Sequence, residues 1–443
     1  MGSILRVAGF ERYIPRLGPA PLILGLCLIP AILLLSLYYV GQSNANQQPR
    51  GCRRLGLQAQ SNLADEHDSR YSGTGSSNGR EEATCKVKSL WIYPVKSCRG
   101  IELNRGQVIS TGMQFDRIFS FAQLRSPFPV SLDTSTSEKS KHRWKFMTQR
   151  DFPMLAQVKT EIWHPDPSSS TYSPQQPNVQ SGGVLVIKYP YEDGGLRGVV
   201  ARLRAALGGE VPHKSVLLPL NPTAEQTDAN GYKSEEMEIW KDSPLALNMA
   251  NTIGPSSKIF MEELQAHLGC SNPLALFRTI PEHHRELYRC APKREELGWQ
   301  PKVGFGDAYP LHILNLASVQ DVGSRLGKDA PSLSALNFRP NIIITGLKPY
   351  AEDEWKRIRI DKHEYYVSCR TVRCLLPNVD QNTGVADKIE PNKTLRSFRC
   401  VDEGATGKAC LGMQMVPATE EAEIQVGDAI GVVETGEHYY IKQ

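Results

Sequence analysis

The chain has 443 residues, of which 40% are hydrophobic and 22% are charged, and its formal net charge is +4 at pH 7. This is the composition of a globular protein with room for two domains and large cores. The small positive excess is spread along the chain, so no polyanionic partner such as nucleic acid is expected. The ten cysteines are irregularly spaced in a chain long enough to need no disulfides. We therefore expect mostly reduced thiols, in the cytosol or another reducing compartment.

The N-terminal region contains a long apolar run. Residues 17–49 include no charged side chain, and Ala20–Val40 is almost wholly apolar. About 20 such residues are needed to cross a hydrocarbon layer, so we expect residues 1–41 to form a single-pass membrane anchor. Basic residues flank the run on both sides, which leaves its orientation open and suits a mitochondrial outer-membrane signal anchor. The polar stretch 42–84 shows no apolar period and is predicted to be a disordered linker.

The rest of the chain contains many short strand patterns and few helical ones. The alternation in 87–92, followed by Pro94, predicts a strand that ends in a turn. Further strands are predicted at 106–110, 116–124, 183–191, 340–346, 356–360, 364–370, 423–434 and 438–443, and helices at 198–209, 256–269 and 315–327. Surface loops are predicted at 126–145 and 165–182, and a hairpin-like turn at 426–430. This pattern indicates a β-rich α+β protein that contains a barrel.

Two cysteines, Cys369 and Cys374, lie among basic residues in the stretch YYVSCRTVRCLLPNVDQNTG. A closed zinc site is one interpretation, although the C-x4-C spacing lacks a second ligand pair. A Cys–His catalytic pair is another, because such partners are brought together by the fold. The third is a thiolate beside Arg370 and Arg373, whose charges lower the pKa of a thiol and favour binding of a soft metal. Strand alternation points the two cysteines apart, which disfavours a shared zinc ion or a disulfide between them.

Basic residues also occur in turns next to predicted strands. Lys96 and Ser97 follow one strand, Arg117 lies at the start of another, and Arg339 precedes Pro340 and a buried-looking strand. An arginine fixed at the mouth of a strand suits a bidentate contact to phosphate or carboxylate. For each of these residues taken alone, a surface salt bridge is the competing interpretation.

Several longer motifs resemble one known family. The motifs LWIYPVKSCRGIEL, FDRIFSF and TQRDFPMLA resemble the N-terminal β-barrel domain that precedes MOSC domains. The motifs LNFRPNIIITGLKPYAEDEWKRIRI, RCLLPNVDQNTG, TLRSFR and IQVGDAI resemble the MOSC domain, named after the C-terminal domain of molybdenum cofactor sulfurase, and in particular the mitochondrial amidoxime-reducing components. The resemblance covers most of residues 86–443. It implies an N-terminal β-barrel domain at 85–272 and a MOSC β-barrel domain at 273–443.

The resemblance also implies a molybdenum cofactor between the two domains. The position of the family's metal ligand is Cys374, which would then be the catalytic residue. The positions expected to bind the rest of the cofactor are Lys96, Ser97, Arg117, Tyr309, Arg339 and Arg373. Among these positions, Tyr309 stands where the family has a small hydroxyl residue. Cys369 is not one of them, and the resemblance assigns it no role. Asp380 is either a proton donor near the metal or a turn-forming residue.

The implied function is reduction of N-hydroxylated compounds such as amidoximes, N-oxides and hydroxylamines. Electrons would come from a flavin reductase through a b-type cytochrome, because this chain shows no flavin or haem motif. A carrier of the cofactor or of persulfide sulfur at Cys374 is the alternative, and a tethered binding protein with a zinc-stapled barrel is a third possibility. Sulfurase activity is not expected, because about 85 residues before the barrel are too few for the pyridoxal-phosphate domain of the full sulfurase.

Overall fold

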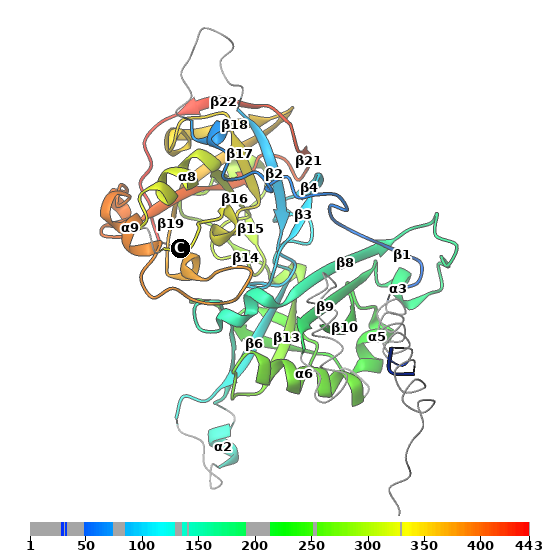
Figure 1. Cartoon of the computed structure of the whole chain (residues 1–443). Helices are drawn as coiled ribbons and strands as arrows, with labels where there is room; N and C mark the ends of the chain where they lie inside the picture. Colours follow the sequence, from blue (N-terminus) through cyan, green and yellow to red (C-terminus); the bar gives the residue numbers. More distant parts are fainter. Residues whose placement is uncertain are drawn as a thin grey trace, which may run out of the picture. The chain divides into compact units, whose positions relative to one another are not determined.

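The computed structural model describes residues 28–30, 32, 48–73, 85–128, 135–139, 141–191, 213–250, 255–327 and 330–442. The described residues within 49–189 and 214–443 form one compact unit (Figure 1). The helix predicted at 198–209 lies outside the described residues. Of the predicted anchor only Leu28–Pro30 and Ile32 are described, and they are helical. Within the described ranges no helix is long and apolar enough to cross a membrane, so the anchor stays a prediction.

The strands of the compact unit form one closed barrel and several open sheets. The barrel has the order β11 (Lys233–Glu238), β12 (Leu245–Asn248), β13 (Leu274–Thr279), β6 (Phe119–Arg125) and β7 (Arg143–Phe146). A four-stranded sheet has the order β1 (Cys52–Arg54), β8 (Lys159–Pro165), β9 (Val184–Pro190) and β10 (His213–Pro219). The chain is therefore β-rich with a closed barrel, as its strand patterns predict.

A larger, eight-stranded sheet lies in the other half of the unit. Its order is β22 (Ile430–Thr435), β18 (Trp355–Ile360), β19 (His363–Val372), β20 (Cys410–Pro417), β16 (Leu311–Asn315), β17 (Ile342–Thr345), β2 (Lys86–Ile92) and β3 (Ile101–Leu103). Two small sheets pair β14 (Arg285–Glu286) with β15 (Lys302–Val303), and order β21 (Glu421–Gln425), β4 (Arg105–Ile109) and β5 (Gly112–Met113).

Sequence-distant segments thus share sheets. Strand β2 pairs antiparallel with β17, with Leu90 opposite Ile342, and β4 pairs antiparallel with β21. Conversely, β13, which follows the predicted domain boundary, lies between β12 and β6, which precede it, in the closed barrel. The domain boundary predicted at 272/273 therefore lies directly before β13. Strands β2 and β4, which precede this boundary, pair with β17 and β21, which follow it. The boundary itself stays a prediction.

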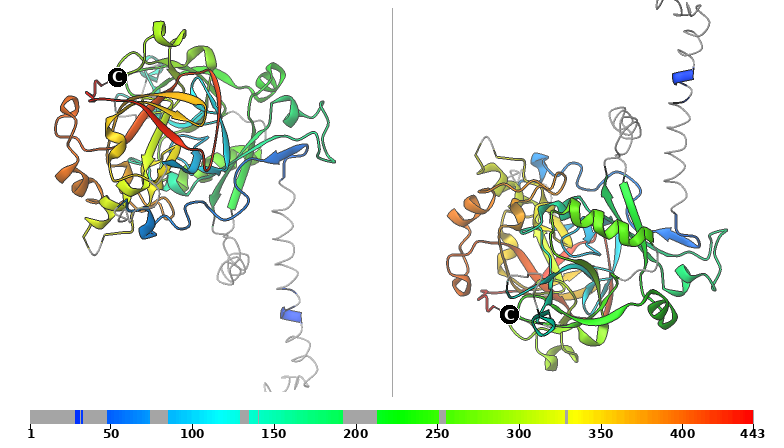
Figure 2. Two further views of the ribbon diagram at one scale, coloured as in Figure 1. Left: turned by 90° about the horizontal axis from the view of Figure 1, so that it is seen from above. Right: turned by 90° about the horizontal axis from the view of Figure 1, so that it is seen from below.

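The described helices are short and lie outside the sheets. They are α2 (Thr136–Lys139), α3 (Pro177–Gln180), α5 (Ala224–Asn230), α6 (Pro255–His267), α7 (Arg294–Leu297), α8 (Leu316–Ser324) and α9 (Asn392–Phe398). The helices predicted at 256–269 and 315–327 are confirmed by α6 and α8. Helix α6 lies against the barrel strand β13 (Figure 1; Figure 2, right). Its His267 packs on Tyr189, with ring centroids 5.3 Å apart.

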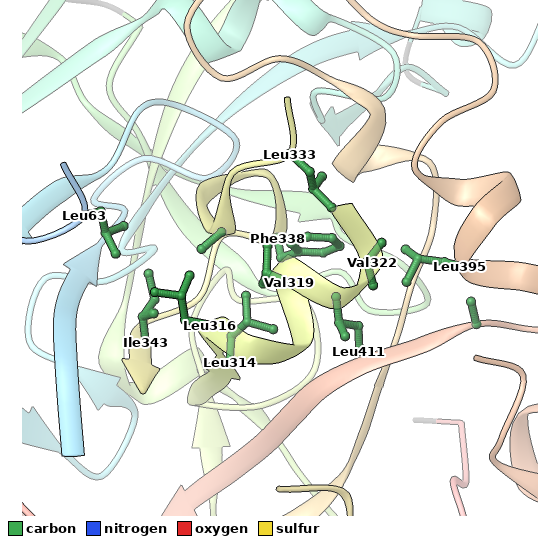
Figure 3. Packing of buried hydrophobic residues seen from close by; sticks show 12 residues of the cluster. Leu63, Leu314, Leu316, Val319, Val322, Leu333, Phe338, Ile343, Leu395 and Leu411 are labelled. Atoms are coloured by element: carbon green, nitrogen blue, oxygen red, sulfur yellow. The ribbon is translucent and has the colours of Figure 1, made fainter. Parts of the chain in front are cut away.

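A buried apolar cluster positions the segment that precedes β17. Residues from α8 and from strands β16, β17 and β20 pack together with Phe338 (Figure 3). Phe338 is the last residue of the 3₁₀ helix η4 (Ala335–Phe338), which Ser334 caps through a capping box. Because Phe338 is 2% exposed and fixed by this packing, the backbone of the next residue, Arg339, is held at a defined place.

Four sequence-based expectations are wrong. The linker predicted to be disordered is ordered over residues 48–73, since β1 pairs with β8 and Leu63 is buried in the cluster of Figure 3. The loop predicted at 126–145 contains α2 and the start of β7, whose polar side chains hid a barrel strand. The turn at 426–430 does not close a hairpin, because β21 pairs with β4 and β22 with β18. No strand occurs within 438–442.

Candidate functional site

The side chain of Tyr93 is the support on which two of the predicted site arginines lie. Tyr93 is 2% exposed, and the guanidinium groups of Arg117 and Arg339 lie 4.9 and 4.1 Å from the centre of its ring. Arg117 Nη2 also donates a hydrogen bond to the carbonyl oxygen of Arg339 (3.0 Å), and the Tyr93 hydroxyl donates to the carbonyl oxygen of Pro340 (3.2 Å). Cation–π contacts are strongest when desolvated, so both arginines are fixed here.

The backbone at this place is held in an uncommon conformation. Ser97, Arg117 and Arg339 have φ angles of 65°, 50° and 51°, in the left-handed region that non-glycine residues seldom adopt. Such conformations persist where the surrounding structure fixes them, and they concentrate at functional sites. The family resemblance implied that these three positions belong to one site, and their shared backbone geometry is a feature that the sequence did not indicate.

Lys96 and two carboxylates complete the basic cluster. Lys96 is 5% exposed; its Nζ donates to the carbonyl oxygen of Phe305 (2.9 Å) and pairs with Asp307. Burial lowers the pKa of Lys96 to about 8, although Asp307 opposes the shift. Arg117 pairs with Asp116, whose charge raises the pKa of Arg117 against the effect of burial. Three cations thus lie close to two carboxylates.

Arg339 has hydrogen-bonding capacity left over. Its Nη1 is 3.4 Å from Gln381 Oε1, while its Nη2 is buried and has no hydrogen-bond partner. Burial lowers the pKa of Arg339 to about 10. A buried guanidinium with an unused donor costs free energy unless an acceptor is supplied. The residues present therefore fit an anionic group such as the phosphate of a cofactor.

Arg373 and Cys374 follow β19 and lie beside this cluster. Arg373 Nη1 donates to the carbonyl oxygen of Phe338 (3.3 Å), its Nε to that of Leu411 (2.9 Å), and its Nη2 is 2.5 Å from His312 Nε2. Burial and the charge of Arg373 hold the pKa of His312 well below its usual range, so this ring is a neutral acceptor. Cys374 is exposed, and its Sγ accepts a hydrogen bond from the backbone N–H of Leu376 (3.5 Å).

The turn after Cys374 joins the cluster to the segment around Gln149. The Gln149 and Gln381 amides exchange two hydrogen bonds of 3.1 and 3.0 Å, and Gln149 Nε2 also donates to the carbonyl oxygen of Ser97 (2.7 Å). Sequence reasoning missed both glutamines, although each lies inside a family-like motif quoted above. Asp380 Oδ1 accepts the backbone N–H groups of Asn382 and Thr383 at 2.8 Å each, so it shapes the turn.

Tyr309 has other contacts. Its hydroxyl donates to the carbonyl oxygen of Arg289 (2.7 Å), and its side chain packs in an apolar cluster with Cys369 and Val416. The structure therefore brings together Lys96, Ser97, Arg117, Arg339 and Arg373, with Cys374 next in sequence, and directs the Tyr309 hydroxyl to a different turn. The role of Tyr309 toward a cofactor stays a prediction.

Cys369 in β19 and Cys374 just after it differ in exposure, in agreement with the prediction that they point apart. Cys369 is fully buried and Cys374 is exposed, and neither is in a disulfide. Among the described residues, no group of three or more His, Cys, Asp or Glu side chains is placed to hold a metal ion.

Comparison with known proteins gives the family. Residues 84–192 match the MOSC N-terminal beta barrel domain, and residues 300–431 match the MOSC domain. The chain is 39% identical to mitochondrial amidoxime reducing component 2 of Macaca fascicularis, over 71% of this chain and 73% of that protein. This chain belongs to the MOSC-domain family. The predicted resemblance is thereby confirmed.

Two further relatives show the breadth of this MOSC similarity. Mitochondrial amidoxime-reducing component 1 of Mus musculus is 25% identical, over 78% of this chain and 81% of the relative. Molybdenum cofactor sulfurase of Oryza sativa subsp. japonica is 24% identical, over 71% of this chain but only 31% of the sulfurase. The similarity to the sulfurase thus concerns less than a third of that protein.

Proposed function

We propose that this MOSC-domain protein binds the molybdenum cofactor and reduces N-hydroxylated compounds. The observation that carries the proposal is the surplus of buried positive charge around Tyr93, where Arg339 Nη2 has no partner, beside the exposed thiol of Cys374. A phosphate-bearing ligand supplies the missing acceptor, and a free thiol is a soft ligand for molybdenum. The names of the amidoxime-reducing relatives support the reaction class.

The residues have separable roles in this proposal. Lys96, Arg117 and Arg339 would hold the phosphate and the pterin of the cofactor, and the Cys374 sulfur would be the ligand that the protein contributes to the metal. When bound, the cofactor supplies the redox chemistry, and the protein supplies binding, orientation and electrostatics. Arg373 is oriented by His312, which accepts its hydrogen bond because the ring is neutral.

The turn 380–384 positions the surroundings of Cys374. Asp380 accepts two backbone N–H groups, which occupies one carboxylate oxygen in shaping the turn, so we assign it no proton transfer. Gln381 connects the turn to Gln149 and through it to the backbone of Ser97. This connection holds the turn after Cys374 in a fixed position relative to the basic cluster.

The proposal extends to partners and place in the cell. The substrates are small amidoximes, N-oxides and hydroxylamines, and the electrons come from a b-type cytochrome and its flavin reductase. Residues 1–41 anchor the protein in the outer mitochondrial membrane, with the folded part in the cytosol. The relatives named mitochondrial support this location.

A second candidate function is transport of the cofactor or of persulfide sulfur on Cys374 without reductase activity. The match to molybdenum cofactor sulfurase over 71% of this chain favours it. Both candidates require a free thiol at Cys374, and only the first requires turnover of an N-hydroxylated substrate.

The test uses the full chain, produced in a host that makes the cofactor. Molybdenum and pterin are measured in the wild type, in Cys374→Ala and in Cys400→Ala, which removes another exposed cysteine as a matched control. Near-stoichiometric molybdenum in the wild type and the control, and its loss in Cys374→Ala, are expected. Absence of pterin and molybdenum from the wild type would overturn the proposal. Reduction of an amidoxime by the loaded protein then separates the reductase from the carrier.

A further inference from the structure

A second pair of sulfur atoms lies away from the basic cluster. Cys290 is in a turn between β14 and α7, and its side chain packs against the cluster that contains Cys369 of β19. Cys369 is 0% exposed and belongs to an apolar cluster with Tyr309, against which Cys290 packs. Nothing in the proposed cofactor site uses these two thiols.

The two sulfurs have different surroundings. Cys290 is partly exposed, and its Sγ accepts the backbone N–H of Ile441 at 3.2 Å. The interaction with Cys369, together with the backbone N–H of Ile441, lowers the pKa of Cys290 to about 6 in spite of burial. The interaction with Cys290 and burial raise the pKa of Cys369 well above its usual range. An accessible thiolate next to a buried thiol is the arrangement of a peroxide-sensing cysteine and its resolving partner.

We propose that Cys290 and Cys369 form an oxidation-sensitive dithiol, which hydroperoxides convert to a disulfide. The Cys290 thiolate attacks one peroxide oxygen, the O–O bond breaks, and the remaining oxygen leaves with a proton as water or an alcohol. The sulfur of Cys369 then attacks the resulting sulfenic acid; the S–S bond forms, the S–O bond breaks, and the hydroxyl leaves as water with the proton from Cys369. The two sulfurs lose two electrons and the peroxide gains them.

Closing the disulfide changes the contacts of the C-terminal segment. The thiolate is the acceptor of the Ile441 N–H, and the neighbouring Arg289 donates from Nη1 to the carbonyl oxygen of Lys442 (2.8 Å). Earlier in the segment, Tyr440 N–H donates to Asp402 (2.8 Å) and Arg370 donates to the carbonyl oxygen of His438 (3.2 Å). Oxidation therefore replaces the thiolate that accepts the Ile441 N–H by an uncharged disulfide sulfur, whereas the bonds of Lys442 to Arg289 and of residues 438–440 remain.

The experiment is peptide mapping of the full chain after reduction and treatment with a small excess of hydrogen peroxide. We expect a disulfide-linked pair of peptides that contain Cys290 and Cys369, and its loss in Cys290→Ser. In Cys369→Ser the sulfenic acid on Cys290 should persist and react with dimedone. At pH 7 Cys290 should oxidise about two- to threefold faster than an added reference thiol of ordinary pKa, because its larger thiolate fraction outweighs its lower intrinsic nucleophilicity.

Cys400→Ser is the matched control, since it removes an exposed thiol outside the pair, and it should leave the linked peptides unchanged. Cys369→Ser places a hydroxyl in an apolar cluster, which could disturb folding. Cys290→Ala, at the partly exposed position, is therefore a second variant that should also abolish the linked peptides. Linkage of Cys290 to a different cysteine, or oxidation of Cys400 before Cys290 in the wild type, would overturn the proposal. Neither readout depends on bound cofactor, so the result is independent of the proposed reductase function.

Discussion

Two buried groups of cations in this molecule differ in how their charge is balanced. In one, Arg399 Nη2 lies 2.6 Å from Asp353 Oδ2, and Arg370 Nη1 lies 3.3 Å from the fully buried side chain of Asp402. The other group lies around Tyr93 and contains three cations, Lys96, Arg117 and Arg339. Among the described residues its ion-pair partners are only two carboxylates, Asp116 and Asp307. The first group has as many carboxylates as arginines, and the second has one cation in excess.

This difference separates a structural role from a ligand-binding role. A buried ion pair is strongly destabilised when one partner is removed, because the other charge is left without compensation. A cluster with one cation in excess already contains an uncompensated charge, so binding of an anion stabilises it. An arginine next to the end of a strand therefore indicates ligand binding only if its carboxylate partners are known, and a sequence pattern does not reveal them.

The largest expected effect is on the balanced group. Asp353→Asn removes the carboxylate that pairs with Arg399 and lies 3.8 Å from Arg370 Nε. The free energy of unfolding should fall by about 3–5 kcal/mol, the cost of leaving a buried charge unpaired. Urea denaturation measures it. A loss below about 1 kcal/mol would show that water already balances these arginines.

A pH effect should arise next to the same group. Glu352 is fully buried, accepts hydrogen bonds from Asn315 Nδ2 (3.1 Å) and Ser318 Oγ (3.0 Å), and has its pKa raised to about 7 by burial and by Asp353. Because the folded state holds this proton more tightly than the unfolded state, its stabilising contribution is present below about pH 4.5 and is lost as the pH rises through 7.

Between pH 5 and pH 8 the wild type should lose on the order of 2–3 kcal/mol more unfolding free energy than Glu352→Gln, which cannot titrate. Denaturation of both proteins at the two pH values gives this difference directly, because contributions of other groups cancel. Equal pH dependence of the two proteins would contradict the assignment.

In the surplus cluster, Arg339→Gln should weaken cofactor retention and leave stability nearly unchanged. Loss of a charge-assisted hydrogen bond corresponds to about 1.5–3 kcal/mol of binding, or at least a tenfold loss of affinity. Pterin and molybdenum retained after gel filtration are the readout, together with the unfolding midpoint. Arg399→Gln is the matched control and should show the reverse, a lower midpoint. A common drop in stability for both variants would remove the distinction between the groups.

The smallest effect concerns Lys96. Its pKa of about 8 means that the ammonium is present at pH 7 and mostly lost at pH 9. Affinity of the cofactor-free protein for sulfate, whose charge is constant over this range, should therefore fall by about five- to tenfold from pH 7 to pH 9. Calorimetric titration of the wild type and Lys96→Met measures it, and the variant should show a weaker pH dependence.

Local patterns predicted much of the fold and of the site. The alternation of β2 and β19, the periodicity of α6 and α8 and the family motifs identified strands, helices and the basic positions, because each depends on neighbours in the sequence. Strand β7 escaped notice because Arg143 and Lys145 look like loop residues, and its place is set by pairing with β6 and β11. The Gln149–Gln381 contact joins residues 232 apart in the chain, and no local signal encodes it.

The exchange of strands between the two halves has a consequence for biosynthesis. Strand β2 emerges from the ribosome some 250 residues before β17, its hydrogen-bonding neighbour, and β4 waits longer still for β21. During that interval the apolar edges of these early strands have no native partner, which favours slow folding, misassociation and capture by chaperones. A fragment that begins after residue 128 would leave β17 with an open, hydrophobic edge, so we expect it to aggregate where the whole chain does not.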